Sequence, residues 1–147
     1  RRHTRYISVT GVQTCALPIS GDFIALSGPL GAGKTAFARA FLYAAAADRG
    51  VAPPVEVPSP TFTLVQGYDL GGLEVSHFDL YRIRDAAEAA ELGLDEALAA
   101  GVVLAEWPER LGADLPRSRL DITLSLTPAG ERAAEITPHG TWQGRLP

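Results

Sequence analysis

The pattern of apolar residues first predicts a strand followed by a helix. Residues 22–26 form a short apolar run that suits a buried strand. In residues 34–49, apolar side chains recur at spacings of three and four, which is typical of a helix with one buried face. Gly50 follows and would end this helix.

A proline-rich segment separates this unit from a predicted hairpin. Residues 51–60 contain four prolines, which fix φ and remove backbone donors, so we expect an extended loop. Residues 61–65 and 73–79 are rich in β-forming side chains. They predict two strands, with a turn over residues 69–72.

Two short helices and a central strand are predicted next. Asp85 would cap a helix that ends near Gly93, and Asp95 would cap a second helix that continues through Ala100. Residues 101–105 form a continuous apolar run, which suits a strand buried in the middle of a sheet.

The chain ends in a predicted strand pair and begins with a segment of different character. Apolar and polar residues alternate cleanly over residues 120–126, residues 128–130 form a turn, and residues 134–137 would return to form an edge pair with them. Residues 1–20 show neither the helical nor the strand period of apolar residues, and polar residues interrupt their apolar positions too often for a signal peptide. We interpret them as an atypical leader that resembles translated adapter or vector sequence, and we expect the domain to span residues 21–147.

Composition narrows the class of protein. With 147 residues and 46% hydrophobic content, the chain supports one compact domain, and no apolar run approaches the roughly 20 residues that span a bilayer. The net charge of −4 argues against direct RNA or DNA binding. Cys15 is the only cysteine, which excludes an internal disulfide and fits a reducing compartment. We therefore expect a cytoplasmic protein without a membrane segment, monomeric when alone.

The connection between the first strand and the first helix matches the GxxxxGK[ST] phosphate-binding pattern. Residues 28–35 read GPLGAGKT and include Lys34, the only lysine of the chain. Glycines let consecutive backbone N–H groups point inward, and the start of the helix adds its unpaired amides. A compact ammonium can enter such a ring of amides, whereas a flat guanidinium would not fit. The pattern predicts a nucleoside-triphosphate site.

Each residue of the pattern has an expected role there. Lys34 would bridge the β- and γ-phosphates of ATP, and the Thr35 hydroxyl would be one ligand of Mg²⁺. The residues expected to bind ATP or ADP through this loop are Gly31, Ala32, Gly33, Lys34, Thr35 and Ala36.

Four other polar or aromatic residues would complete the site, although each also has an ordinary structural interpretation. Asp79 follows a strand and would hold Mg²⁺, or it would cap a turn. Glu106 follows a buried strand and would position metal or water, or remain a solvated strand end. Thr61 would sense the γ-phosphate or belong to an ordinary proline turn. Trp107 would stack on a ligand or fill the margin of the core.

Two further residues carry weaker signals. We expect His77 to be a packed or partly exposed strand histidine rather than a base. Arg82 would face a phosphate or pair with Asp79 or Asp85, and pairing is favoured.

Five segments together resemble the TsaE (YjeE) family of bacterial P-loop ATPases in their order and spacing. They are GPLGAGKT at 28–35, PSPTFTL at 58–64, HFDLYR at 77–82, ELG at 91–93 and EWPE at 106–109. The resemblance covers about residues 21–140. It implies an α/β, P-loop NTPase-like fold of three layers, with a mixed central sheet flanked by helices.

The resemblance also implies a function. Members of this family are ATPases that support formation of N6-threonylcarbamoyladenosine beside the tRNA anticodon, acting on the TsaD–TsaB complex rather than on tRNA. It further implies a catalytic or nucleotide-handling role for Lys34, Thr35, Thr61, Asp79, Glu106 and Trp107. The chain departs from the family pattern in two places. Pro29 stands where the family usually has an acidic residue, and it removes one backbone donor from the loop. The leader stands in place of the helix and strand that normally precede the phosphate loop.

Three other functions compete with this interpretation. A small-molecule kinase shares the loop but needs an acceptor pocket and clustered arginines, and Arg117 and Arg119 are the only close pair downstream. A binding module would use ATP as a conformational clamp without hydrolysing it. A GTPase is disfavoured because the chain contains no asparagine and therefore no NKxD guanine-reading motif.

Overall fold

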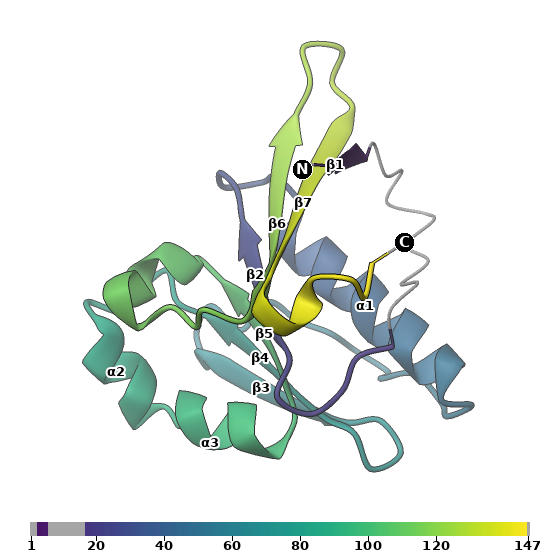
Figure 1. Cartoon of the computed structure of the whole chain (residues 1–147), viewed down its shortest axis with the longest axis vertical. Helices are drawn as coiled ribbons and strands as arrows, with labels where there is room; N and C mark the ends of the chain where they lie inside the picture. The colour runs from purple at the N-terminus through teal and green to yellow at the C-terminus, as the bar shows by residue number, and fades with distance from the viewer. Residues whose placement is uncertain (1–2, 6–16, 147) are drawn as a thin grey trace.

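One mixed β-sheet with helices on both faces makes up the fold (Figure 1). The computed structural model describes residues 3–5 and 17–146, so most of the predicted leader, including Cys15, lies outside the described residues. The strands are β1 His3–Arg5, β2 Phe23–Ser27, β3 Val65–Asp69, β4 Glu74–Asp79, β5 Val102–Glu106, β6 Arg119–Leu126 and β7 Arg132–His139.

The sheet places the strand that leads into the glycine loop at its centre. Its order among the described residues is β1-β7-β6-β2-β5-β4-β3. The four middle strands, β6, β2, β5 and β4, run parallel, while β3, β7 and β1 join antiparallel. The carboxyl ends of β2, β4 and β5 therefore meet at one edge of the sheet, where open parallel sheets bind ligands.

Helices form the two outer layers. The helix α1, Lys34–Asp48, covers one face, whereas α2 Ala86–Glu91, α3 Leu94–Ala100 and the 3₁₀ segment η1 Pro108–Asp114 lie on the other (Figure 1). A second 3₁₀ segment, η2, spans Gly140–Trp142. No helix in the described ranges combines the length and apolar character needed to cross a bilayer.

The alternation of strand side chains divides the interior into two cores. In β2, Ile24 and Leu26 pack in the core under α1, whereas Phe23 and Ala25 pack in the core under α2 and α3. All four are at most 1% exposed. Two cores on opposite faces of one mixed sheet confirm the predicted three-layer α/β fold.

Most predicted elements are present, and their ends differ by one or two residues. The predicted hairpin is β3 and β4, and the expected cap of α2 forms, with the Asp85 side chain accepting a hydrogen bond from the Glu88 amide. The cap predicted at Asp95 is wrong. Gly93 precedes α3 instead, with φ 86°, and Asp95 lies within the first turn.

The strand predicted over residues 61–65 is wrong for its first four residues, which form a turn ahead of β3. The Leu64 amide donates to the Pro60 carbonyl at 2.7 Å, and Leu64 has φ 66°, which is incompatible with a strand. The predicted edge position of residues 134–137 is also wrong, because β1 pairs with β7 on its outer side.

Gly101→Ala should destabilise the fold by about 1–3 kcal/mol. A Cβ atom at Gly101 would lie 2.1 Å from the carbonyl oxygen of Glu74 at the start of β4, so the backbone would have to move. Gly67→Ala in β3 is the matched control, since a Cβ atom there meets nothing within 4 Å. Urea unfolding measures both variants, and equal losses of stability would contradict the close approach at Gly101.

Candidate functional site

The predicted phosphate loop lies between β2 and α1 in a conformation that depends on its glycines. Gly31 and Gly33 have φ of 77° and 104°, a region that side-chain-bearing residues rarely adopt. The cap residue of α1 is Gly33, which has no side chain to accept from the first amides of the helix, and a phosphate would supply that acceptor. The Ala32 amide, by contrast, donates to the Pro29 carbonyl at 3.1 Å and is used within the loop.

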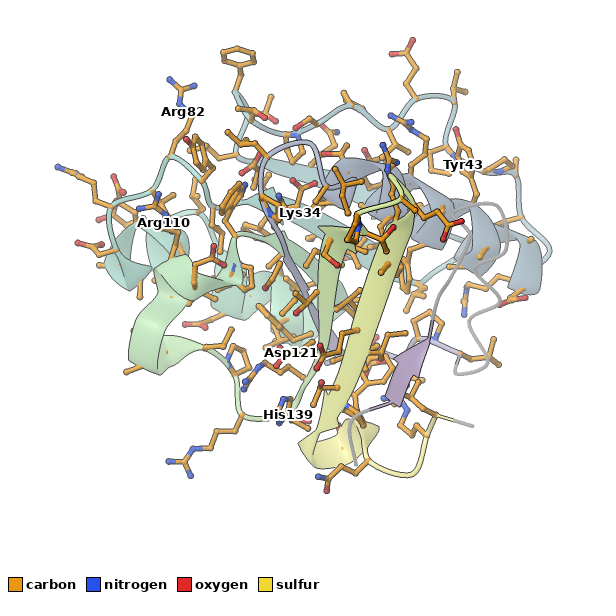
Figure 2. The ribbon with its side chains drawn as sticks, turned by 90° about the horizontal axis from the view of Figure 1, so that it is seen from above. Lys34, Tyr43, Arg82, Arg110, Asp121 and His139 are labelled. Atoms are coloured by element: carbon orange, nitrogen blue, oxygen red, sulfur yellow. The ribbon has the colours of Figure 1, made fainter. Side chains whose placement is uncertain are left out.

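Lys34 is buried at the centre of this loop, and Figure 2 shows it in the middle of the molecule. Its Nζ donates to the carbonyl oxygens of Gly28 at 2.7 Å and Pro29 at 2.8 Å. The ring centroid of Trp107 lies 4.1 Å from the same nitrogen, close enough for a cation–π interaction. The ammonium thus joins the start of the loop to the residue that follows β5.

Burial lowers the pKa of Lys34 below its ordinary value, because a charged group loses solvation there. The negative charges of Glu106, Glu109 and Asp79 oppose this shift and favour the charged ammonium. These carboxylates therefore support the form of Lys34 that a phosphate would bind.

The two predicted carboxylates lie side by side. Asp79 ends β4, Glu106 ends β5, and the two residues are direct partners in the parallel register. They are 4% and 3% exposed, so Glu106 is not the solvated strand end that the local pattern allowed. Asp79 does cap a turn, since its Oδ1 accepts a hydrogen bond from the Tyr81 amide at 3.0 Å.

Each carboxylate accepts a hydrogen bond from a predicted threonine. Thr35 Oγ1 donates to Glu106 Oε1 at 2.8 Å, and Thr61 Oγ1 donates to Asp79 Oδ2 at 3.0 Å. The structure therefore brings the start of α1, the proline-rich loop and two strand ends together around Lys34.

The carboxylate and hydroxyl oxygens of this site suit Mg²⁺ as ligands. Mg²⁺ is a hard cation that proteins hold with one or two carboxylates, and it takes its other ligands from phosphates and water. In the described part of the chain, no group of three or more His, Cys, Asp or Glu residues is placed to hold a metal ion. Thr35, Asp79 and Glu106 would accordingly hold the ion as part of a nucleotide complex.

His77 is a member of the site that the sequence analysis did not include. It is fully buried, as a packed strand histidine would be, and its Nε2 lies 2.9 Å from Glu106 Oε1. Since an ionised carboxylate only accepts, Nε2 carries the proton and donates. The spacing of two between His77 and Asp79 was an available signal, because such residues share one face of a strand.

Trp107 lies beside the Lys34 ammonium. Its backbone is left-handed, with φ 59° and ψ 50°, and its amide donates to the Leu26 carbonyl of β2 at 3.3 Å. The ring packs against Tyr81, with centroids 4.9 Å apart, and covers the Lys34 ammonium. Its predicted role as a nucleotide-binding residue would thus be exerted near the phosphates.

Arg82 makes neither of the ion pairs favoured from the sequence. Its guanidinium lies 5.6 Å from the ring centroid of Phe62, and Figure 2 shows its side chain projecting outward. The two expected partners are engaged elsewhere: Asp85 caps α2, and Asp79 accepts from Thr61 and from the Tyr81 amide.

His77→Leu should lower the free energy of unfolding by about 1–3 kcal/mol, because Glu106 would stay buried with one donor fewer. His77→Gln keeps an amide donor and should retain more stability. Urea unfolding measures both variants. His77→Leu in a Glu106→Leu background is the control, because without the carboxylate the loss of unfolding free energy should be smaller. A loss of the same size in that background would show that the hydrogen bond does not account for the effect.

Comparisons with known proteins agree with the resemblance drawn from the motifs. The family model described as "Threonylcarbamoyl adenosine biosynthesis protein TsaE" matches residues 4–134. The tRNA threonylcarbamoyladenosine biosynthesis protein TsaE of Bacillus subtilis (strain 168) is 40% identical over 125 residues, which are 84% of this chain and 73% of that protein. TsaE of Treponema pallidum (strain Nichols) is 35% identical over 118 residues, 80% and 81% of the two chains.

The fold agrees as well. The crystal structure of YdiB from Bacillus subtilis matches with a TM-score of 0.73 and 29% identity, covering 99% of this chain and 91% of that one. A family model that spans most of the chain, together with relatives of this identity and coverage, leads to one conclusion: the chain belongs to the TsaE family.

Proposed function

We propose that the chain is a Mg²⁺-dependent ATPase that supports formation of N6-threonylcarbamoyladenosine in tRNA through the TsaD–TsaB complex. The observation that carries the ATPase proposal is the buried Lys34 ammonium in a glycine loop beside two paired carboxylates. The relatives are named for tRNA threonylcarbamoyladenosine biosynthesis, and membership of their family supports the same role here.

Lys34 and the loop amides would stabilise negative charge on the triphosphate. Two of the three ammonium protons of Lys34 are directed to the Gly28 and Pro29 carbonyls, which leaves the third for a phosphate oxygen. Fixed donors of this kind act without reorganising during the reaction and are often the largest contribution to catalysis.

The carboxylates and their threonines would handle metal and water. Mg²⁺, when bound, would neutralise charge on the phosphate oxygens. Thr35 and Asp79 would hold it, and Thr61 would report the presence of the γ-phosphate to its loop. Glu106 accepts two hydrogen bonds on Oε1, and within the described residues no donor engages Oε2. That oxygen is therefore the one that would orient the metal shell or the attacking water, giving ADP and phosphate.

A protein partner fits the surroundings of this site better than a direct tRNA contact. Leu30 in the loop is 72% exposed, and Phe62 beside Thr61 is 87% exposed. Apolar side chains of this exposure suit a protein interface, whereas the net charge of −4 does not favour a nucleic-acid surface. We assign the TsaD–TsaB complex as this partner from the family, and expect slow turnover without it.

Lys34→Ala should reduce ATP turnover in the assembled complex by at least about 100-fold, the effect of removing one preorganised donor of developing charge. Phosphate release measured with TsaD–TsaB tests this. Arg84→Ala is the control, because that side chain is 85% exposed and, among the described residues, its ion pair is with Glu88, four positions on in α2. Unchanged turnover in Lys34→Ala would remove the proposed role, and transfer of labelled γ-phosphate to a metabolite would identify a kinase instead.

Asp79→Asn should raise the Mg²⁺ concentration needed for half-maximal turnover, since an amide is a weaker ligand than a carboxylate for a hard cation. Glu106→Gln should lower kcat by more than it weakens ADP binding, because it removes the group that positions water or metal. Asp95→Asn, in the first turn of α3, provides a charge-matched control. A Mg²⁺ dependence unaltered by Asp79→Asn would exclude it as a ligand.

A further inference from the structure

His77 lies on the face of β4 that packs under α1, beside an apolar core. Its neighbour along the same face is Val75, and its direct partner in the register with β5 is Leu104. Both of these side chains belong to the core under α1, and both are fully buried, as His77 is. The imidazole is therefore a polar ring between an apolar core and Asp79, the next residue on that face.

The ring makes one polar contact with the described residues. Nε2 lies 2.9 Å from Glu106 Oε1 and donates to it, whereas Nδ1 is buried without a hydrogen-bond partner in the described part of the chain. A buried polar atom without a partner destabilises the fold, and an apolar side chain of similar size would avoid that penalty. Packing alone therefore does not explain a histidine here. Its contact with Glu106 is what distinguishes it from a leucine.

Glu106 is held through one of its two oxygens. Oε1 accepts from His77 of β4 and from Thr35 of α1, while no described donor engages Oε2. Thr35 is also the expected Mg²⁺ ligand, so the orientation of its hydroxyl would depend on whether metal is bound. His77 has no exposed surface, so a ligand that enters from solvent does not contact it. The imidazole is thus the donor to Glu106 that a bound nucleotide leaves in place.

We infer that His77 is a positioning residue for the hydrolytic step, whose Nε2–H fixes Oε1 of Glu106 so that Oε2 faces the attacking water or the metal shell. The inference rests on the proposed function and names the residue that orients Glu106. His77 itself touches neither nucleotide nor metal. Its loss should therefore lower kcat and leave the affinity for nucleotide nearly unchanged.

ATP turnover with TsaD–TsaB at saturating Mg²⁺, together with calorimetric titration of Mg-ADP, tests this role. His77→Leu should lower kcat by about tenfold or more, the usual effect of losing a group that orients a functional side chain. The Kd for Mg-ADP should change by less than about twofold. His77→Gln keeps an N–H donor and should retain more turnover than His77→Leu. Wild-type kcat in His77→Leu would overturn the inference, and so would a loss of Mg-ADP affinity as large as the fall in kcat.

Val75→Ala is the control for lost stability. It removes buried methyl groups from the same face of β4 and leaves a cavity in the core under α1, away from the end of the strand. All variants are compared at a temperature at which circular dichroism shows them to be folded. Val75→Ala should keep the wild-type kcat. A fall equal to that of His77→Leu would show a general effect of instability and would exclude the positioning role.

A double variant tests whether His77 acts through Glu106. If it does, adding His77→Leu to Glu106→Gln should cause no further fall in kcat, measured above the rate of Lys34→Ala. Two losses that multiply would contradict the inference.

Nitrogen-15 NMR of the full chain labelled at histidine gives a readout that does not depend on turnover. The His77 signals, identified by their absence in His77→Gln, should show a protonated Nε2 and an unprotonated Nδ1. An unprotonated Nε2 would rule out the donor on which the inference depends.

The same measurements keep this inference apart from the proposed function. If wild type hydrolyses ATP with TsaD–TsaB and Lys34→Ala does not, the proposed function stands whatever His77 does. If wild type does not hydrolyse ATP in that complex, both fail.

Discussion

The burial of one ammonium, that of Lys34, is the constraint around which the site is arranged. A buried charge is costly unless hydrogen bonds and opposite charges compensate for the loss of water. Here two loop carbonyls, the face of Trp107 and the nearby carboxylates do so. The same contacts fix the bend of the glycine loop and the turn after β5, so the start of α1 and the end of β5 are positioned relative to one cation.

The parallel register supplies the opposite charges. Asp79 and Glu106 are adjacent at the ends of β4 and β5, where two ionised groups of like charge would repel. Hydrogen-bond donors offset this repulsion: the Thr61 hydroxyl donates to Asp79, while the Thr35 hydroxyl and the imidazole of His77 donate to Glu106. Each carboxylate is therefore held in one orientation by neighbours from other elements, before any ligand arrives.

How much the sequence could predict depended on how local each feature is. β2 and β5 follow from continuous apolar runs, α1 follows from a helical apolar period, and the phosphate loop follows from a contiguous pattern. Residues 61–64 were mistaken for strand because their β-forming composition is overruled by a bond from Thr61 to Asp79, 18 positions away. The contact of His77 with Glu106 depends on strand register, which local pattern does not contain. The roles of Asp79 and Glu106 were left open by pattern alone and came from family resemblance.

Because Lys34 is both the only lysine and just 5% exposed, all side-chain amine chemistry of this protein is confined to one shielded nitrogen. Apart from the terminal amine, an acylating reagent has no other aliphatic amine to modify, and it reaches this one only when the glycine loop opens. Acylation would also abolish the positive charge and leave a single N–H on the nitrogen, so a modified molecule could not rebuild both contacts with Gly28 and Pro29. The mass of the intact chain after brief labelling would therefore report how often that loop opens, without any engineered probe.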